Sequence, residues 1–213
     1  FLKVSPLIDP AMIAAYKKRG IIMLGRYNFP PQVLYANKKL TSLADLKGMK
    51  MRVTSPEQAE FLKRFGATSV TIGTPEVAPA LERGVIEGVL TANSGGGVGW
   101  KDLLKYNYRL GVNFVDAVVI VNEESFGKLP AATQQKVRKI VSDAMPEVTQ
   151  ALRDMEGVLG KQFAAEGMVI TEPPADEAAK NSAQFADYWQ SWAKSRGPEA
   201  VEGLAKIRAA LGK

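Results

Sequence analysis

The stretch LADLKGMKMRVTSPEQAEFLKRFGAT, residues 43–68, carries the local signals that decide the fold. Its segment MKMRVT, 49–54, alternates apolar residues with basic or polar ones, which predicts a strand. The helix after it is predicted to begin at the cap Ser55, with Gln58 completing a capping box, and to end at Gly66. A strand followed directly by a short helix is typical of the parallel βαβ unit.

The same alternation continues outside this stretch. TSVTI at 68–72 predicts a strand, Thr74 begins the next helix, Gly84 ends it, and VIEGVL at 85–90 predicts another strand. Upstream, Asp9 is predicted to cap a helix. Further strands are predicted at 21–24, 32–37, 106–113, 116–122 and 168–171, and helices at 130–166, 175–196 and 198–211. The pattern predicts an α/β fold with parallel-rich sheets and long C-terminal helices.

Three parts are expected along the chain. Residues 1–31 are predicted to form the remainder of a first lobe and a segment that crosses to a second lobe. Residues 32–115 are predicted to form that second α/β lobe. Residues 116–213 are predicted to supply a return strand and long helices that the lobes share. The expected architecture is therefore two-lobed, with an incomplete first lobe.

The composition argues against several kinds of chemistry. The 213 residues include no cysteine and no histidine, so the sequence offers no disulfide, thiolate nucleophile, Ser–His triad or ordinary zinc site. No pair of carboxylates or lysines is placed for catalysis, and we expect no catalytic residue, no metal and no cofactor. The net charge of +6 comes from scattered basic residues without a nucleic-acid-binding motif, so we expect no nucleic-acid partner.

Arg52 is the strongest candidate for ligand binding. It lies near the carboxyl end of its predicted strand, and in parallel sheets ligands bind beyond the carboxyl ends of the strands. The helix predicted to begin at Ser55 has free N–H groups that favour an anion. An arginine can hold a carboxylate through two parallel hydrogen bonds. The alternative is an arginine paired with a nearby glutamate or left in solvent, and spacing alone does not separate these interpretations.

Several segments together resemble the solute-binding proteins of TRAP transporters, the DctP-like family. Members of that family have a leucine-aspartate-leucine-lysine-glycine stretch, a strand with an arginine, a glycine-alanine pair, a glutamate-valine helix and a glycine-containing turn. The counterparts here are Leu43 to Gly48, Arg52, Gly66-Ala67, Glu76-Val77 and Gly84 to Gly88. The resemblance covers roughly residues 10–165, and its specificity lies in the order and spacing of these segments.

The resemblance implies a periplasmic protein of the two-lobed periplasmic-binding-protein type, which holds a small organic acid in a cleft. In that family the arginine at the position of Arg52 binds the ligand carboxylate, and ligand contacts of other members fall at Ser55 and Thr74. The family delivers its ligand to the membrane subunits of a TRAP transporter and is not enzymatic. A typical member also has a sizeable N-terminal part of the first lobe ahead of the position of residue 1.

Two departures from the family pattern bear on the ligand. Some members, the sialic-acid binders among them, have a second arginine where this chain has the neutral Gln32. Where those members carry polar residues after the glycine-containing turn, this chain has Val89, Leu90 and Thr91. That loss of polar groups, with the glycine-rich loop that follows, suggests a monocarboxylate with an apolar or aromatic body. The sequence does not name the ligand or set the oligomeric state.

The remaining candidates have two interpretations each. In the loop TANSGGGVGW, 91–100, Thr91 and Asn93 either bind the far end of the ligand or belong to a flexible turn, since the loop lacks the lysine of a P-loop. Tyr27 either lines the pocket or holds the hinge. The alternative functions are the ligand-sensing domain of a membrane receptor and an α/β enzyme acting on a small acid. The enzyme requires paired titratable groups, which the sequence does not show.

Overall fold

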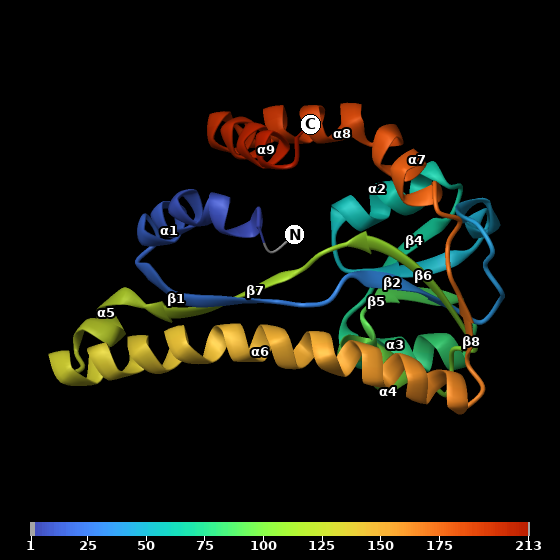
Figure 1. The fold of residues 1–213 in the computed structure, drawn as a ribbon, viewed down its shortest axis with the longest axis horizontal. Coiled ribbons are helices and arrows are strands. Elements are labelled where there is room, and N and C mark those ends of the chain that lie inside the picture. The colour runs from blue at the N-terminus through green and yellow to red at the C-terminus, as the bar shows by residue number, and fades with distance from the viewer. Residues whose placement is uncertain (1–2, 213) are drawn as a thin grey trace. The chain divides into compact units, whose positions relative to one another are not determined.

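The computed structural model describes residues 3–212, and the chain divides into two compact units. Unit 1 comprises Phe1–Asn28, Asp116–Ala151 and Lys180–Lys213, and unit 2 comprises Phe29–Val115 and Leu152–Ala179. Each unit is therefore assembled from segments far apart in the sequence, and Figure 1 shows the helices and strands that they contain. The three-part division expected from the sequence stays a prediction.

Unit 2 is built on a six-stranded sheet in the order β4-β3-β5-β2-β6-β8. Its strands are β2 Gln32–Ala36, β3 Lys50–Val53, β4 Thr68–Thr71, β5 Gly88–Thr91, β6 Tyr106–Asn113 and β8 Val169–Thr171. β3 pairs in parallel with β4 and with β5, and β6 pairs in parallel with β8, whereas β2 runs antiparallel to both β5 and β6. The predicted α/β class with parallel pairing is confirmed, and the reversed direction of β2 is a feature that was not predicted.

The strand and helix around β3 follow the predicted local signals. α2, Pro56–Arg64, begins where the Ser55 hydroxyl accepts a hydrogen bond from the backbone N–H of Gln58 (3.2 Å). It ends before Gly66, whose φ of 73° is a left-handed conformation that suits glycine. The predicted capping box is wrong in one respect. The Gln58 side chain accepts a hydrogen bond from the backbone N–H of Thr54 (2.8 Å), not from that of the cap residue.

Helices cover both faces of this sheet. In Figure 1, α2 lies on one side of the sheet and α3, Thr74–Glu82, lies on the other. On the α3 side, buried strand residues pack with Trp100 and Phe163 in one hydrophobic cluster. Leu34 alternates with Val33 and Tyr35 of that cluster, so it faces the opposite side, and it is fully buried there. The shorter helices of the unit are η2 Leu43–Leu46, η3 Asn93–Gly97 and α4 Val98–Trp100.

Unit 1 contains a ribbon of two antiparallel strands, β1 Ile21–Asn28 and β7 Asp116–Asn122. The register shifts at Leu24, which forms a bulge. A Cβ atom at Gly25 would lie 2.7 Å from Cγ1 of Val141, so glycine permits the close approach of a helix to the ribbon. The helices of unit 1 are η1 Ser5–Ile8, α1 Asp9–Lys17, α5 Glu123–Gly127, α8 Ala186–Arg196, α9 Pro198–Ala210 and the first part of α6, Ala131–Ala165.

Several predicted boundaries differ from those of the structure. The strand predicted at 85–90 begins only at Gly88, and the strand predicted at 21–24 extends to Asn28. The helix predicted over 175–196 is two helices, α7 Glu177–Gln184 and α8, which separate at Phe185. These differences lie at element ends, where the hydrogen bonds that extend or stop an element come from parts of the chain that are distant in sequence.

Candidate functional site

The carboxyl ends of β3, β4, β5 and β6 lie at one edge of the unit 2 sheet, and the antiparallel β2 begins at that edge. The structure brings four residues that were predicted to bind a ligand to this edge. They are Arg52 in β3, Ser55 just after it, Thr91 at the end of β5 and Gln32 at the start of β2. Since ligands of such sheets bind beyond the carboxyl ends of the strands, this edge is the candidate site.

Arg52 places a buried positive charge near this edge. The residue is 6% exposed, and its Nε donates a hydrogen bond to the carbonyl of Ile72 (3.2 Å). Its guanidinium carbon lies 5.6 Å from the centroid of a Trp100 ring, which is within range of a cation–π interaction. Burial lowers the pKa of Arg52, because a low-dielectric environment disfavours the charged form. Arginine nevertheless stays protonated in proteins, so the site carries a full positive charge.

No counter-ion for Arg52 is present in the part of the chain that the structure describes. No carboxylate of residues 3–212 lies within 4.0 Å of its guanidinium nitrogens, and its Nη1 and Nη2 make no hydrogen bond to those residues. The interpretation that a nearby glutamate pairs with Arg52 is therefore wrong. Glu60 in α2 pairs with Arg64 instead (2.9 Å). The solvent interpretation is wrong as well, because Arg52 is buried.

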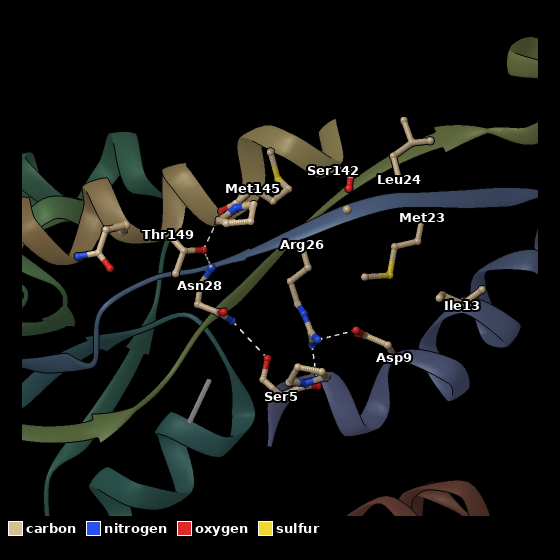
Figure 2. A pocket seen from close by; sticks show the side chains of 14 residues that line it. Ser5, Asp9, Ile13, Met23, Leu24, Arg26, Asn28, Ser142, Met145 and Thr149 are labelled. Carbon is tan, nitrogen blue, oxygen red and sulfur yellow. Dashed lines mark hydrogen bonds and ion pairs between the residues drawn. The ribbon is translucent and has the colours of Figure 1, made fainter. Parts of the chain in front are cut away.

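Arg26 of β1, in unit 1, has a side chain that is only 8% exposed, and carboxylates neutralise its charge. Its Nη2 lies 2.7 Å from Oδ2 of Asp9, and its Nη1 lies 3.2 Å from Oδ2 of Asp116. Nη1 also donates to the carbonyl of Ser5 (2.8 Å). Figure 2 shows this side chain reaching from β1 towards Asp9 and Ser5. These residues line a cavity of about 560 Å³. Two carboxylates on one guanidinium leave Arg26 no charge for a further anion.

The sequence predicted that Asp9 caps α1, and this prediction is wrong because Asp9 belongs to the same ion-pair cluster. Asp9 is the first residue of α1, whose N-cap is Ile8 at the end of η1, and its carboxylate bonds to Arg26 rather than to the first N–H groups of the helix. Burial raises the pKa of Asp9, although Arg26 acts in the opposite direction, and Asp116 raises it further. The carboxylate of Asp9, which the local pattern assigned to a helix cap, forms an ion pair with Arg26 instead.

The charge of Arg109 in β6 is neutralised too, by Glu156. The same carboxylate also holds the glycine-rich loop 91–100. Nη1 of Arg109 lies 3.4 Å from Oε1 of Glu156, a buried residue of α6. The Glu156 carboxylate also accepts hydrogen bonds from the backbone N–H groups of Asn93 (3.1 Å) and Ser94 (3.0 Å). Asn93 was predicted to contact the ligand, but it is fully buried, and its side chain bonds to Arg109 (3.1 Å) and to the Glu156 carbonyl (3.0 Å). We therefore leave Asn93 out of the proposed ligand contacts.

The glycine-rich loop holds Trp100 in place. Thr91 accepts a hydrogen bond at Oγ1 from the backbone N–H of Gly96 (2.9 Å), so this predicted contact already serves the loop. A Cβ atom at Gly96 would lie 2.1 Å from the Trp100 ring, and only glycine permits that approach. The loop therefore determines where the indole lies beside Arg52.

Three amide side chains meet at the same edge of the sheet. Gln58 is buried, and its Nε2 donates to Oε1 of Gln32 and to Oδ1 of Asn113 (3.1 Å). Its Oε1 accepts from the backbone N–H (2.8 Å) and the hydroxyl (3.0 Å) of Thr54. Gln58 and Asn113 were not predicted to belong to the site. Asn113 faces Gln32 across β2 and β6. Knowing that these strands pair would have placed Asn113 at the site, but the local sequence does not reveal the pairing.

The other predicted contacts lie in different settings. The Ser55 hydroxyl caps α2, and Thr74 is exposed in the first turn of α3, whose N-cap is Gly73. Tyr27 lies in β1 and belongs to unit 1. The ligand roles of these residues stay predictions. Over residues 3–212, no three acidic side chains are grouped so that they could hold a metal ion, and no helix has the length and apolar character needed to span a membrane.

Comparison with known proteins points to a single family. The family described as "Bacterial extracellular solute-binding protein, family 7" (DctP) matches residues 7–195. A curated relative, the sialic acid-binding periplasmic protein SiaP of Vibrio cholerae, is 27% identical over 143 residues, which are 65% of this chain and 44% of the relative. The chain therefore spans less than half the length of that relative.

Solved structures agree with the fold. DctP7 and DctP6 of Bordetella pertussis, two extracytoplasmic solute receptors that bind pyroglutamic acid, both match with a TM-score of 0.89. They are 29% and 26% identical to this chain, cover 97% and 100% of it, and are covered by it over 69% and 70% of their own length. The predicted fold class, a two-lobed α/β protein of the periplasmic-binding-protein type, is confirmed by this similarity.

Proposed function

This chain belongs to family 7 of the bacterial extracellular solute-binding proteins, the DctP family, and we propose that it captures a small organic acid through Arg52. The resemblance seen in the sequence is thereby confirmed, and so is the predicted location outside the cytoplasm. The family is one of binding proteins and not of enzymes. Binding without chemistry is accordingly the function that we propose.

One observation carries this proposal: the buried charge of Arg52 has no counter-ion among residues 3–212. Removing a charge from water is costly unless another charge or a set of hydrogen bonds compensates it. Arg26 and Arg109 show that the chain supplies carboxylates to partly buried arginines where the charge is structural. At Arg52 we propose that the carboxylate comes from the ligand, held by the free Nη1 and Nη2 groups.

The charge at the site favours one carboxylate on the ligand. Arg52 supplies a single positive charge, since Arg109 is committed to Glu156 and Gln32 is neutral. DctP7 and DctP6 bind pyroglutamic acid, a small ring with one carboxylate, and both are more than 25% identical to this chain. We propose a ligand of that class. Delivery of the bound acid to the membrane subunits of a TRAP transporter is part of the proposal and rests on family membership.

The proposal is tested by adding acids to the protein and measuring its unfolding. A panel of mono- and dicarboxylates that includes pyroglutamate and succinate should contain an acid that, at a hundred times its Kd, stabilises the protein by about 2.7 kcal/mol. For that acid, Arg52→Met should raise the Kd measured by titration calorimetry roughly 150-fold, since truncating one partner of a buried charge pair costs about 3 kcal/mol.

Arg83→Met is the matched control, because Arg83 is an exposed arginine of unit 2 and its replacement changes the net charge by the same amount. Its Kd should stay within about twofold of the wild-type value, as expected for a surface charge. An Arg52→Met protein that binds the acid as tightly as the Arg83→Met protein contradicts the proposed role of Arg52. A panel without any stabilising acid contradicts the proposed function as a whole.

A further inference from the structure

Gln58 is buried at the candidate site, and both ends of its amide are engaged. This inference rests on the proposed function and extends it. We propose that Gln58 turns the amide NH2 groups of Gln32 and Asn113 towards the ligand. The edge of the sheet then offers hydrogen-bond donors and selects a monocarboxylate that carries a second, uncharged oxygen acceptor.

The orientation of the Gln58 amide follows from a backbone group. The N–H of Thr54 can only donate, and it lies 2.8 Å from the side-chain oxygen of Gln58, which the Thr54 hydroxyl also reaches (3.0 Å). The end of Gln58 that faces Thr54 must therefore be the oxygen. Its Nε2 then faces the other way, and because Gln58 is only 4% exposed, no water replaces these partners.

The orientation of Gln58 in turn sets that of its two neighbours. Nε2 of Gln58 can only donate, so the atoms that meet it must be oxygens: Oε1 of Gln32 and Oδ1 of Asn113 (3.1 Å). The NH2 groups of both neighbours consequently point away from Gln58. That of Gln32 has no partner among residues 3–212, and that of Asn113 makes one long contact to the Phe114 carbonyl (3.5 Å). Both residues are half-buried, so these donors remain accessible.

The donors lie at the edge that carries the charge. Gln32 and Asn113 face each other where β2 begins and β6 ends, and β2 is separated from β3 only by β5. Neighbouring strands are about 4.8 Å apart, so the axes of β2 and β3 are roughly 10 Å apart. Arg52 pairs with Val89 on the Trp100 face of the sheet, whereas Gln32 and Asn113 bond to Gln58 of α2. The guanidinium and the two amides thus approach the end of the sheet from its two faces, and a ligand that lies beyond this end is open to both.

This arrangement defines what the ligand must present. A guanidinium and two amide NH2 groups are all donors, and they carry one positive charge in total. A matching ligand has one carboxylate and a further oxygen that accepts hydrogen bonds, such as a lactam or keto oxygen. An acid of the same shape without that oxygen leaves the amide donors without a partner, and sites built for a hydrogen bond discriminate against such analogues.

Two ring acids separate the contribution of the second oxygen from that of the carboxylate. Pyroglutamate has a five-membered ring with a lactam oxygen, and cyclopentanecarboxylate has the ring and the carboxylate alone. The wild-type protein should bind pyroglutamate about tenfold more tightly by titration calorimetry. In the Gln58→Glu protein both side-chain oxygens accept, so Gln32 and Asn113 rotate to donate to Glu and turn their own oxygens to the ligand. The ratio of the two affinities should then fall to about one or below.

The negative charge that Glu adds weakens the binding of both acids alike, because each carries one carboxylate. It therefore does not change the ratio of the two affinities. Gln135→Glu, an exposed site on α6, adds the same charge and should keep the wild-type ratio. Gln32→Ala and Asn113→Ala remove the donors directly and should lower the ratio, which keeps the test valid if Gln58→Glu does not fold. A wild-type ratio in all the folded variants overturns the inference and leaves Arg52 binding intact. A wild-type protein that binds neither ring acid also overturns it, whereas the proposed function is judged on the full acid panel.

Discussion

Arg26 and Arg52 should differ in their effect on stability when each is replaced by methionine, with a clear loss for Arg26 and none for Arg52. Methionine is long and apolar, so the replacement removes the charge while filling much of the same space. Arg26→Met leaves the carboxylates of Asp9 and Asp116 without their cation, and their side chains are only 31% and 17% exposed. Arg52→Met leaves no carboxylate behind, because none is paired with Arg52 within the residues that the structure describes.

The magnitudes follow from these surroundings. Breaking a buried ion pair costs about 3–5 kcal/mol, and the partial exposure of Asp9 places Arg26→Met near the lower end, at a loss of about 3 kcal/mol. The pKa of Asp9, already raised by burial, should rise further without Arg26. The loss should therefore shrink as the pH falls and Asp9 becomes protonated. Arg52→Met gives up one hydrogen bond to Ile72 and the cation–π contact with Trp100, but it removes a buried charge that no carboxylate neutralises, so its free energy of unfolding should stay equal or rise by about 1 kcal/mol.

Urea unfolding without ligand at about pH 7 measures both changes. Comparable losses in both proteins, or a loss above about 2 kcal/mol for Arg52→Met, would refute the reasoning that Arg52 is held ready for an external anion.

Two further predictions concern the glycine-rich loop and Asp45, which caps η2 by accepting a hydrogen bond from the backbone N–H of Ser42 (3.0 Å). Gly96→Ala should displace Trp100 and weaken acid binding about tenfold by calorimetry, whereas Gly99→Ala, whose Cβ would meet no atom within 4 Å, should leave the Kd unchanged; equal effects would contradict the positioning role of the loop. Hydrogen bonds from the N–H (2.7 Å) and hydroxyl (2.8 Å) of Thr41 lower the pKa of Asp45, so its contribution to stability is present above the ordinary carboxyl pKa and is lost as the pH falls through the lowered value. Asp45→Asn should cost about 1 kcal/mol near pH 7 in urea unfolding and progressively less in acid, and a pH-independent cost would argue against this explanation.

Local signals in the sequence predicted the strand–helix succession of unit 2 because the residues that start and stop its elements act on their neighbours. Ser55 caps α2 through a bond to a residue three positions away, and Gly66 ends the helix by its own backbone conformation. The direction of β2 was not predictable in this way, because strand pairing is decided by segments more than fifty residues apart. Asp9 failed as a predicted cap for the same reason, since its partner Arg26 lies on another element.

In the candidate site, too, local sequence patterns predicted some residues, and contacts between distant segments decided the roles of others. Arg52 was found because it precedes a helix start at the end of a strand, which is a local pattern. That it lacks a carboxylate is a property of the folded unit, as is the burial of Asn93 against Glu156, 63 residues away. Gln58 was assigned to a cap by its spacing from Ser55, and its contacts with two distant amides appear only when β2 and β6 are paired.

The reversed direction of β2 also brings together the two ends of one segment of unit 2. This segment begins at Phe29 and ends at Val115, and the N–H of Phe29 donates to the carbonyl of Val115 (2.9 Å). Gln32 and Asn113 form the next residue pair between β2 and β6. An acid held by these amides therefore binds close to two of the four positions at which the chain passes from one unit to the other.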